Sequence, residues 1–432
     1  LACWAAPRVE SHAPPRAAGR GLQAPVTKLR PPTPPPSPMR IQRIQLKNWL
    51  NYQKLDTRVL GDLRERLFII GPNAAGKSNL LEALRFLRDV AFPAGKKPQA
   101  GGLQNAVTEA RGGIAKVRCL NAKADNEVGI TVHLASVDGT AWVYDLGFKN
   151  EGRGNNRIKV TREVVTRDGR VVLQRPTPID REDPEQLTQT HLELTNANSA
   201  FRELSHFFSE TTYLHLVPQL LKFGPRLGGS IIEADPFGQG FLQRIAATNE
   251  KTRDARLRRI ILALKKVVPQ FDDLRFVKDS ITGLPHLEGN FIHWRERGAW
   301  QRENQFSDGT LRLIALLWSL MDGTSLLLLE EPELSLNEGI VQNLPRLIRR
   351  FQSQAKTPRQ VFITTHSEAL LSDQSIGADE VLRLVTTANG TEIKPPDPHE
   401  EIMLQSGLSV GDVLLPSIKP AGSDQLHLAL GS

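Results

Sequence analysis

Apolar residues near position 70 form two patterns on either side of a glycine-containing run. The uninterrupted apolar run at residues 67–70 predicts a short buried strand. An earlier segment, residues 40–46, is apolar at positions 41, 44 and 46, which suits a partly buried strand. After the glycines, apolar residues return with helical spacing at Leu80, Leu81, Leu84, Leu87 and Val90. The pattern predicts a strand, a loop and a helix in direct succession.

Two different periodicities follow in the middle of the chain. Residues 115–175 alternate apolar and polar positions, and the dipeptides Asp138-Gly139 and Asp168-Gly169 are strong hairpin signals. Residues 182–270 change to helical spacing with charge-rich faces, for example at residues 251–268, a segment that ends before Pro269. We therefore expect an antiparallel β segment and then a helical insertion.

The last third of the chain returns to alternating strands and helices. Its pattern predicts a helix at 310–321, a strand at 326–329, a helix at 340–354 and a strand at 361–364. The expected fold class is α/β, with a mixed or parallel sheet, an antiparallel β subdomain and a helical insertion. The expected divisions are 39–148, an insertion at 149–292, a second half at 293–395 and an extension at 396–432.

The N-terminal segment has a different composition. Residues 1–38 contain ten prolines, which favours an extended and disordered tail. We expect Met39 to be the true start of the protein, and the alternative is a Pro-rich docking arm. The tail also carries half of the net charge of +8, because it has five basic residues against one acid. Net charge is therefore weak evidence for DNA binding.

Composition excludes several classes of protein. The chain has 432 residues, of which 40% are hydrophobic, so it is long enough for a large core. Cys3 and Cys119 are the two cysteines, which favours a reducing compartment over a disulfide framework. No apolar stretch is long enough to span a membrane. We expect a cytoplasmic protein without a membrane partner.

The glycine-containing run fits the phosphate-binding P-loop pattern, and its place between strand and helix meets the structural requirement of that motif. It reads Gly71, Pro72, Asn73, Ala74, Ala75, Gly76, Lys77 and Ser78, and it is followed by Asn79. Backbone N–H groups and Lys77 would bind the β and γ phosphates of ATP, and Ser78 would bind Mg²⁺. The alternative is an accidental glycine-rich turn.

Two acids follow the predicted strand at 326–329. Phosphoryl transfer needs one carboxylate near the metal and one near the attacking water. We expect Glu330 to hold Mg²⁺ and Glu331 to position and polarise the water. If the chain had no P-loop, the better interpretation would be that Glu330 and Glu331 are solvated acids in a loop.

Residues 330–336, with the sequence Glu-Glu-Pro-Glu-Leu-Ser-Leu, resemble the Walker B motif and D-loop of soluble ABC-type ATPases. Glu330 departs from the usual Asp of that family. Residues 305–312 resemble the ABC signature, with Asp308 where transporters commonly have Gly. The resemblance implies that Ser307 and Gly309 contact the nucleotide of a partner subunit in a head-to-tail homodimer that sandwiches ATP.

Two further residues follow from the same resemblance. Residues 361–367 resemble the strand that leads to the switch histidine, so His366 is expected at the γ-phosphate. Gln104 is the candidate for the Q-loop ligand of Mg²⁺. Asn48-Trp49 resembles an early pair of RecF-type and SMC-type heads, and either Trp49 or Tyr52 would approach the base unless both pack in the core.

The spacing of these motifs indicates which kind of ABC-type ATPase the chain resembles. Lys77 and Ser307 are 230 positions apart, which disfavours a transporter subunit, and the intervening residues lack the heptads of a long-armed SMC protein. The chain is similar to the compact RecF/SMC-head-like and OLD-like AAA family ATPases of genome maintenance and phage defence. Sixty-six residues follow His366, too few for a Toprim nuclease, so a nuclease or toxin effector is expected as a separate protein.

Three functions remain open at this stage. The leading one is an ATP-driven dimeric switch in phage defence, whose helical insertion senses DNA or a protein. The second is a RecF-like DNA-repair clamp that binds DNA through Lys251, Arg253, Arg256, Arg258, Arg259, Lys265 and Lys266. A solvated helix face explains this basic cluster equally well. The third is a nucleotide-binding scaffold without turnover, against which the presence of Glu331 argues.

Overall fold

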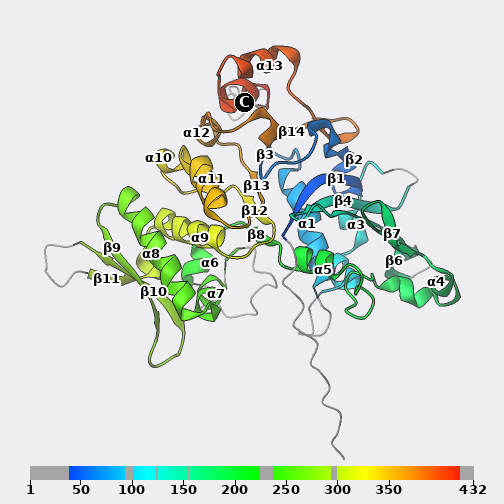
Figure 1. Cartoon of the computed structure of the whole chain (residues 1–432), viewed down its shortest axis with the longest axis horizontal. Coiled ribbons are helices and arrows are strands. Elements are labelled where there is room, and N and C mark those ends of the chain that lie inside the picture. The colour runs from blue at the N-terminus through cyan, green and yellow to red at the C-terminus, as the bar shows by residue number, and fades with distance from the viewer. Residues whose placement is uncertain are drawn as a thin grey trace, which may run out of the picture. The chain divides into compact units, whose positions relative to one another are not determined.

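The computed structural model describes residues 38–92, 101–122, 125–152, 155–223, 237–238, 240–292 and 299–418 (Figure 1). Of the N-terminal tail, residues 1–38, only Pro38 is among these residues, so the expectations for the tail lie outside the described part of the chain. No helix among the described residues combines the length and apolarity that crossing a membrane requires.

A six-stranded sheet carries the P-loop, and its order is β15-β14-β3-β13-β12-β8. The strands β14, β3, β13, β12 and β8 run parallel, and β15 pairs antiparallel with β14 at the edge. Their bounds, in the same order, are Gly390–Ile393, Val381–Thr387, Arg66–Ile70, Val361–Thr364, Leu327–Glu330 and Thr212–Leu214. The parallel arrangement brings the carboxyl ends of β3, β12 and β13 to one edge, where ligands bind in such sheets.

This central sheet separates two hydrophobic cores, and the side-chain alternation of its strands explains why. In β3, Leu67 and Ile69 belong to one core, and Phe68 and Ile70 belong to the other. The first core includes side chains of α1 (Lys77–Ala91) and of the antiparallel sheet described below. The second includes side chains of α9 (Asp308–Met321) and α11 (Leu344–Gln354). Burial on both faces accounts for the unbroken apolar runs in these strands.

The predicted antiparallel β segment is confirmed as a second six-stranded sheet, with the order β2-β1-β4-β5-β6-β7. Its strands are Tyr52–Asp56, Met39–Trp49, Val128–Ser136, Ala141–Gly152, Asn155–Arg167 and Arg170–Arg175. Asp168 and Gly169 both have positive φ, 48° and 76°, as the predicted tight hairpin requires. The division expected at residues 148/149 falls inside β5, which pairs with β4 and β6, so the sheet runs across it without a break.

The expected helical insertion at 182–270 is only partly helical. It includes α8 (Glu250–Val267), which ends before Pro269 as predicted, but it also includes β8, which pairs with β12 in the central sheet. The chain thus returns to the main fold within this segment. A third sheet follows, in the order β11-β10-β9, with the bounds Ala299–Arg302, Pro285–Phe291 and Phe271–Lys278.

One helix predicted from the sequence is divided into two helices in the structure. The segment expected as a helix at 340–354 forms α10 (Glu338–Val341) and α11, which begins at Leu344 with Pro345 in its first turn. Proline has no N–H for an intrahelical bond, so it fits a helix start better than an interior. The remaining helices are α2 (Leu103–Val107), α3 (Ile114–Val117), α4 (Pro178–Glu182), α5 (Arg202–Ser209), α6 (Pro218–Phe223), α7 (Phe241–Ala247), α12 (Glu368–Leu371), α13 (Pro398–Gln405) and α14 (Val410–Leu414).

Candidate nucleotide site

The P-loop joins β3 to α1 as the sequence predicts. Gly76 has φ 91° and stands at the N-cap of α1, where no side chain caps the first turn. The free N–H groups of that turn form a site suited to an anion. At Gly71, a Cβ would lie 2.8 Å from the backbone oxygen of Leu384 in β14, so the loop requires glycine there.

Residues at the end of β1, the start of β2 and the turn between them form hydrogen bonds with the P-loop and the first turn of α1. Tyr52 donates its hydroxyl hydrogen bond to the Gly76 oxygen at 2.7 Å, and Trp49 Nε1 donates to the Asn79 oxygen at 2.9 Å. Both aromatic side chains are fully buried, so neither is available to a base, and the alternative of core packing is confirmed. Asn51 was not predicted from the sequence. Its Nδ2 donates to the Ala75 oxygen at 3.2 Å, and its Oδ1 accepts from Asn79 at 2.8 Å.

Lys77 lies at the start of α1 with 8% of its surface exposed. Its Nζ donates to the Gly71 oxygen at 3.0 Å and to the Pro72 oxygen at 3.3 Å. Burial lowers the pKa of the Lys77 amine, and the nearby carboxylates of Glu331 and Glu330 act in the opposite direction. A buried cation among backbone carbonyls is well matched to a phosphate ligand.

Ser78 and Glu330 lie together at the mouth of the P-loop. The Ser78 hydroxyl donates to Glu330 Oε1, and the hydroxyl of Tyr213 in β8 donates to Glu330 Oε2. The adjacent hydroxyl and carboxylate fit Mg²⁺, which takes one or two protein oxygens and completes its shell with water and phosphate. No cluster of three or more His, Cys, Asp or Glu suited to a metal occurs in the described parts of the chain.

Tyr213 is a site residue that the sequence did not reveal. It follows no recognisable motif, and it reaches Glu330 because β8 pairs with β12, with Tyr213 opposite Leu328. Burial is the first cause that raises the pKa of the Tyr213 hydroxyl, and the charge of Glu330 is the second. Tyr213 therefore remains a proton donor to Glu330 at neutral pH.

Glu331 and His366 meet at the ends of neighbouring strands. Nδ1 of His366 lies 3.0 Å from Glu331 Oε1, and the Glu331 amide donates to the Thr364 oxygen at 3.1 Å. Glu331 has φ 43°, a conformation that is uncommon for a residue other than glycine and often occurs at functional sites. The carboxylate and the imidazole thus form a pair beside the P-loop.

Glu333 is the third carboxylate near the P-loop, and the sequence assigned it no role of its own. Its Oε1 accepts from the Thr365 hydroxyl at 2.6 Å, which connects the D-loop to the residue before His366. Its Oε2 is buried and has no hydrogen-bond partner among the described residues. Burial raises the pKa of the Glu333 carboxyl, and the Thr365 bond lowers it by a smaller amount.

The signature residues lie at the N-terminus of α9. The Ser307 hydroxyl caps this helix and accepts from the Thr310 amide at 3.1 Å. Asp308 is held by Lys222 at 2.5 Å and by Gln219 at 3.0 Å, both from α6. A Cβ at Gly309 would lie 2.6 Å from the Ser335 oxygen, so the signature packs directly against the D-loop of its own chain.

Gln104 does not occupy the predicted place. Its Nε2 donates to the oxygens of Ile158 at 2.7 Å and Thr188 at 2.8 Å, and its Oε1 accepts from the Ile158 amide at 3.0 Å. The side chain therefore joins α2 to β6 and the segment after α4. The expectation that Gln104 is a ligand of Mg²⁺ is wrong, because the amide completes backbone pairing at this junction.

Comparisons with known proteins identify a family and similar folds. The model of the family described as "AAA domain, putative AbiEii toxin, Type IV TA system" matches residues 67–372. No curated protein shows a significant match.

The chain is also similar to solved structures. One is an SMC head bound to the C-winged helix domain of ScpA, with a TM-score of 0.50 and 14% identity over 84% of this chain and 99% of that chain. Another is an SMC head domain from Thermotoga maritima, with a TM-score of 0.43 and 13% identity over 83% of this chain and 99% of that chain. The first of these shows the fold. The chain belongs to the AAA_21 family, and its fold is similar to that of an SMC head.

Proposed function

We propose that this protein binds and hydrolyses ATP with Mg²⁺ as a head-to-tail homodimer, and that its nucleotide state controls a separate effector in phage defence. The observation that carries the hydrolytic part is the Glu331–His366 pair, 3.0 Å apart, beside the P-loop. The toxin–antitoxin description of the family supports the role in defence.

In this proposal each residue of one chain has a defined task. The N–H groups at Gly76–Ser78 and the Lys77 amine bind the β and γ phosphates, and Ser78 and Glu330 hold Mg²⁺. The metal ion supplies positive charge that neutralises charge developing on the phosphates. Glu331 orients the attacking water and accepts its proton as a general base, and His366 holds Glu331 in place.

The partner chain would complete the site. Among the described residues, no hydrogen bond joins Ser307 or Gly309 to the P-loop of the same chain. Ser307 caps the first turn of α9, whose dipole favours an anion. We place Ser307 and Gly309 against the γ-phosphate of the partner subunit's ATP.

A mixing experiment tests the shared site. Lys77→Ala removes the P-loop cation, and Ser307→Arg blocks the signature, so each full-length variant alone should lack ATPase activity. Random pairing of equal amounts would restore about a quarter of the wild-type activity, because half of the dimers regain one intact site. Activity in either variant alone, or no recovery on mixing, would count against the head-to-tail dimer. Wild-type turnover is the control for the preparation.

A RecF-like DNA clamp is the second candidate, and the contacts of α8 bear on it. Arg256 pairs with Asp322 at 2.7 Å, Lys265 pairs with Asp272 at 2.9 Å, and the Arg253 guanidinium stacks over Phe276. These intramolecular contacts use part of the basic cluster. The remaining exposed cations are Lys251, Arg258, Arg259 and Lys266. Stimulation of ATP turnover by duplex DNA, fading as salt rises, would favour the clamp. Nucleotide binding without turnover under any condition would instead indicate a scaffold.

A further inference from the structure

A groove runs between α8, α9 and α11, away from the P-loop. Its volume is about 640 Å³, within the range of ligand-binding clefts. Apolar side chains from all three helices line it, namely Leu262, Leu313, Leu317, Leu347 and Phe351. Each of the three helices therefore contributes apolar side chains to the groove.

Two apolar side chains on α8 remain open to solvent at this groove. Leu262 is 68% exposed and Val267 is 41% exposed, whereas Leu317 on the floor is 1% exposed. Apolar groups that are gathered in a groove, rather than scattered singly, often mark an interaction site. The groove thus offers apolar area that a partner could remove from water.

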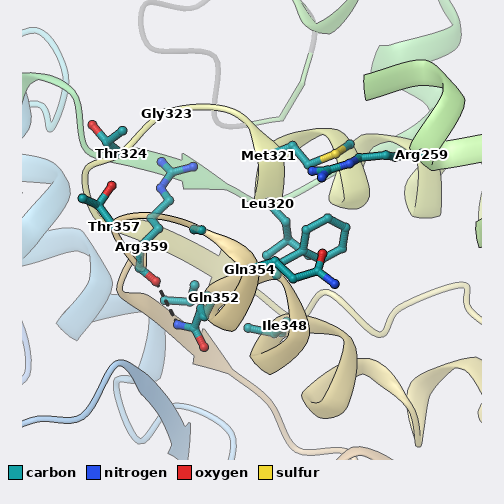
Figure 2. Close-up of a pocket in the computed structure, with 13 residues that line it drawn as sticks. Arg259, Leu320, Met321, Gly323, Thr324, Ile348, Gln352, Gln354, Thr357 and Arg359 are labelled. Atoms are coloured by element: carbon teal, nitrogen blue, oxygen red, sulfur yellow. Dashed lines mark hydrogen bonds between the residues drawn. The ribbon is translucent and has the colours of Figure 1, made fainter. Parts of the chain in front are cut away.

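A smaller hollow of about 200 Å³ continues the groove towards the C-terminal end of α9. The two share Arg259, Phe351 and Gln354 as lining residues. Figure 2 shows Arg259 lying beside Met321 at one side of this hollow and Arg359 on the other. Arg359 is occupied by its own chain, because it donates to the Ser319 oxygen at 2.9 Å and to the Thr212 hydroxyl at 2.7 Å.

The charges around the groove have one sign. No Asp or Glu is among the residues lining either hollow, whereas Arg259, Lys266, Arg346 and Arg350 line the larger one. Arg346 pairs with Asp373 at 3.1 Å. For the other three, no ion pair occurs with any described residue. The rim is therefore positively charged and complementary to carboxylates.

We propose that this groove binds an amphipathic helix of a partner protein, with Leu-type side chains on one face and Asp or Glu beside them. The apolar floor would receive residues spaced at i, i+3, i+4 and i+7, and Arg259, Lys266 and Arg350 would meet the acids. The exposed leucine favours this occupant over DNA, because a phosphate backbone gains nothing from Leu262.

The position of the groove connects it with the nucleotide site. The helix α9 begins at the signature, next to Ser307, and contributes Leu313 and Leu317 to the groove. A helix seated there would contact the same rigid element that carries the signature. Binding of the helix does not depend on ATP hydrolysis. A test of helix binding is therefore independent of a test of the proposed ATPase function.

A selection with helical peptides tests the proposal. The probe is a displayed library of about 18-residue peptides, long enough for five turns. Leu is fixed at i, i+3, i+4 and i+7, and all other positions are random. The bait is the full-length wild-type protein, with counter-selection on the double variant Leu262→Glu, Lys266→Glu. We expect enrichment of acidic peptides that bind wild type and bind either single variant at least tenfold more weakly. The matched controls are Ile281→Glu, at a position 92% exposed in the β9–β10 turn, and Lys54→Glu, which should bind as wild type.

Four results would overturn the proposal. The first is a selection that yields no peptide whose binding depends on the groove, and the second is enrichment of neutral or basic peptides. The third is loss of the dimer in Leu262→Glu in the absence of peptide, because that result would identify a second copy of the chain as the occupant. The fourth is binding of a 20-base-pair duplex, about two helical turns, that is lost in Lys266→Glu and Arg350→Glu while acidic peptides fail to compete. Circular dichroism and thermal unfolding of each variant establish that the fold is retained.

Discussion

Nδ1 of His366 lies 3.0 Å from Oε1 of Glu331, although the two residues are 35 positions apart in the chain. The register of two parallel strands produces this approach. Glu330 at the end of β12 is opposite Thr364 at the end of β13, so the residues that follow each strand leave the sheet at the same edge. Backbone pairing therefore brings the two residues together, and the proposed positioning of a water molecule would rest on this pairing.

Glu331→Gln should slow ATP turnover by about 10²- to 10⁴-fold, because the amide cannot accept the proton of the attacking water. The substitution keeps the size of the side chain, so nucleotide binding should persist. Steady-state phosphate release measures the first effect, and retention of labelled ATP on a desalting column measures the second. Glu338→Gln, an exposed carboxylate on α10, is the matched control. Unchanged turnover in Glu331→Gln would remove this residue from the catalytic role.

Tyr213→Phe should raise the Mg²⁺ concentration required for half-maximal ATPase activity by about 10- to 100-fold, the usual cost of losing a partner of a metal ligand. The hydroxyl holds Oε2 of Glu330, and Phe leaves that oxygen without its donor. A titration with Mg²⁺ at saturating ATP measures the shift. Tyr144→Phe is the control, since it also removes a buried hydroxyl, here one that donates to Glu163. Equal Mg²⁺ curves for wild type and Tyr213→Phe would contradict the role of Tyr213.

Local patterns in the sequence were sufficient to predict the elements around the candidate nucleotide site. The P-loop motif specifies its own strand–loop–helix context, so β3 and α1 could be predicted from residues 67–90 alone. The strands before Glu330 and before His366 were recognisable because both faces are buried, which gives continuous apolar runs.

Pairings between distant segments could not be read in the same way. Tyr213 lies in a three-residue strand with no motif, and only its pairing with β12 brings it to Glu330. Gln104 follows two glycines, a context that was compatible with a Q-loop. Its position in the structure is instead determined by the packing of α2 against β6. The continuity of the antiparallel sheet through residue 148 likewise depends on partner strands, which periodicity does not identify.

Glu333→Gln should remove a pH dependence of stability. Burial raises the pKa of Glu333 above its ordinary value of 4.5, so the folded state favours the protonated carboxyl. Its contribution to the free energy of unfolding is complete below pH 4.5 and is lost as pH rises through the raised pKa. The difference in stability between Glu333→Gln and wild type should therefore grow in favour of Gln as pH increases.

Urea unfolding at several pH values measures this difference. Thr365→Val is the companion variant, because it deletes the donor to Oε1 that favours the ionised form. Its stability should fall more steeply with pH than that of wild type, and the double variant should lose this steepness. A stability difference between Glu333→Gln and wild type that is constant with pH would contradict the assignment.

Gly309→Ala should reduce ATP turnover by at least about tenfold, since displacements near 1 Å at a positioned site can cost 10²-fold. A Cβ at residue 309 would lie 2.6 Å from the Ser335 oxygen, so the signature and the D-loop must move apart. The effect on stability should be smaller, because Ala is favoured over Gly in a helix by about 1 kcal/mol, which offsets part of the clash. Gly339→Ala is the matched control in the first turn of α10, where the nearest atom to a Cβ is Asn337 Oδ1 at 3.3 Å. Turnover and thermal unfolding of both variants separate the two effects: a loss of turnover equal in Gly309→Ala and Gly339→Ala would show that the Gly309–Ser335 contact has no specific role.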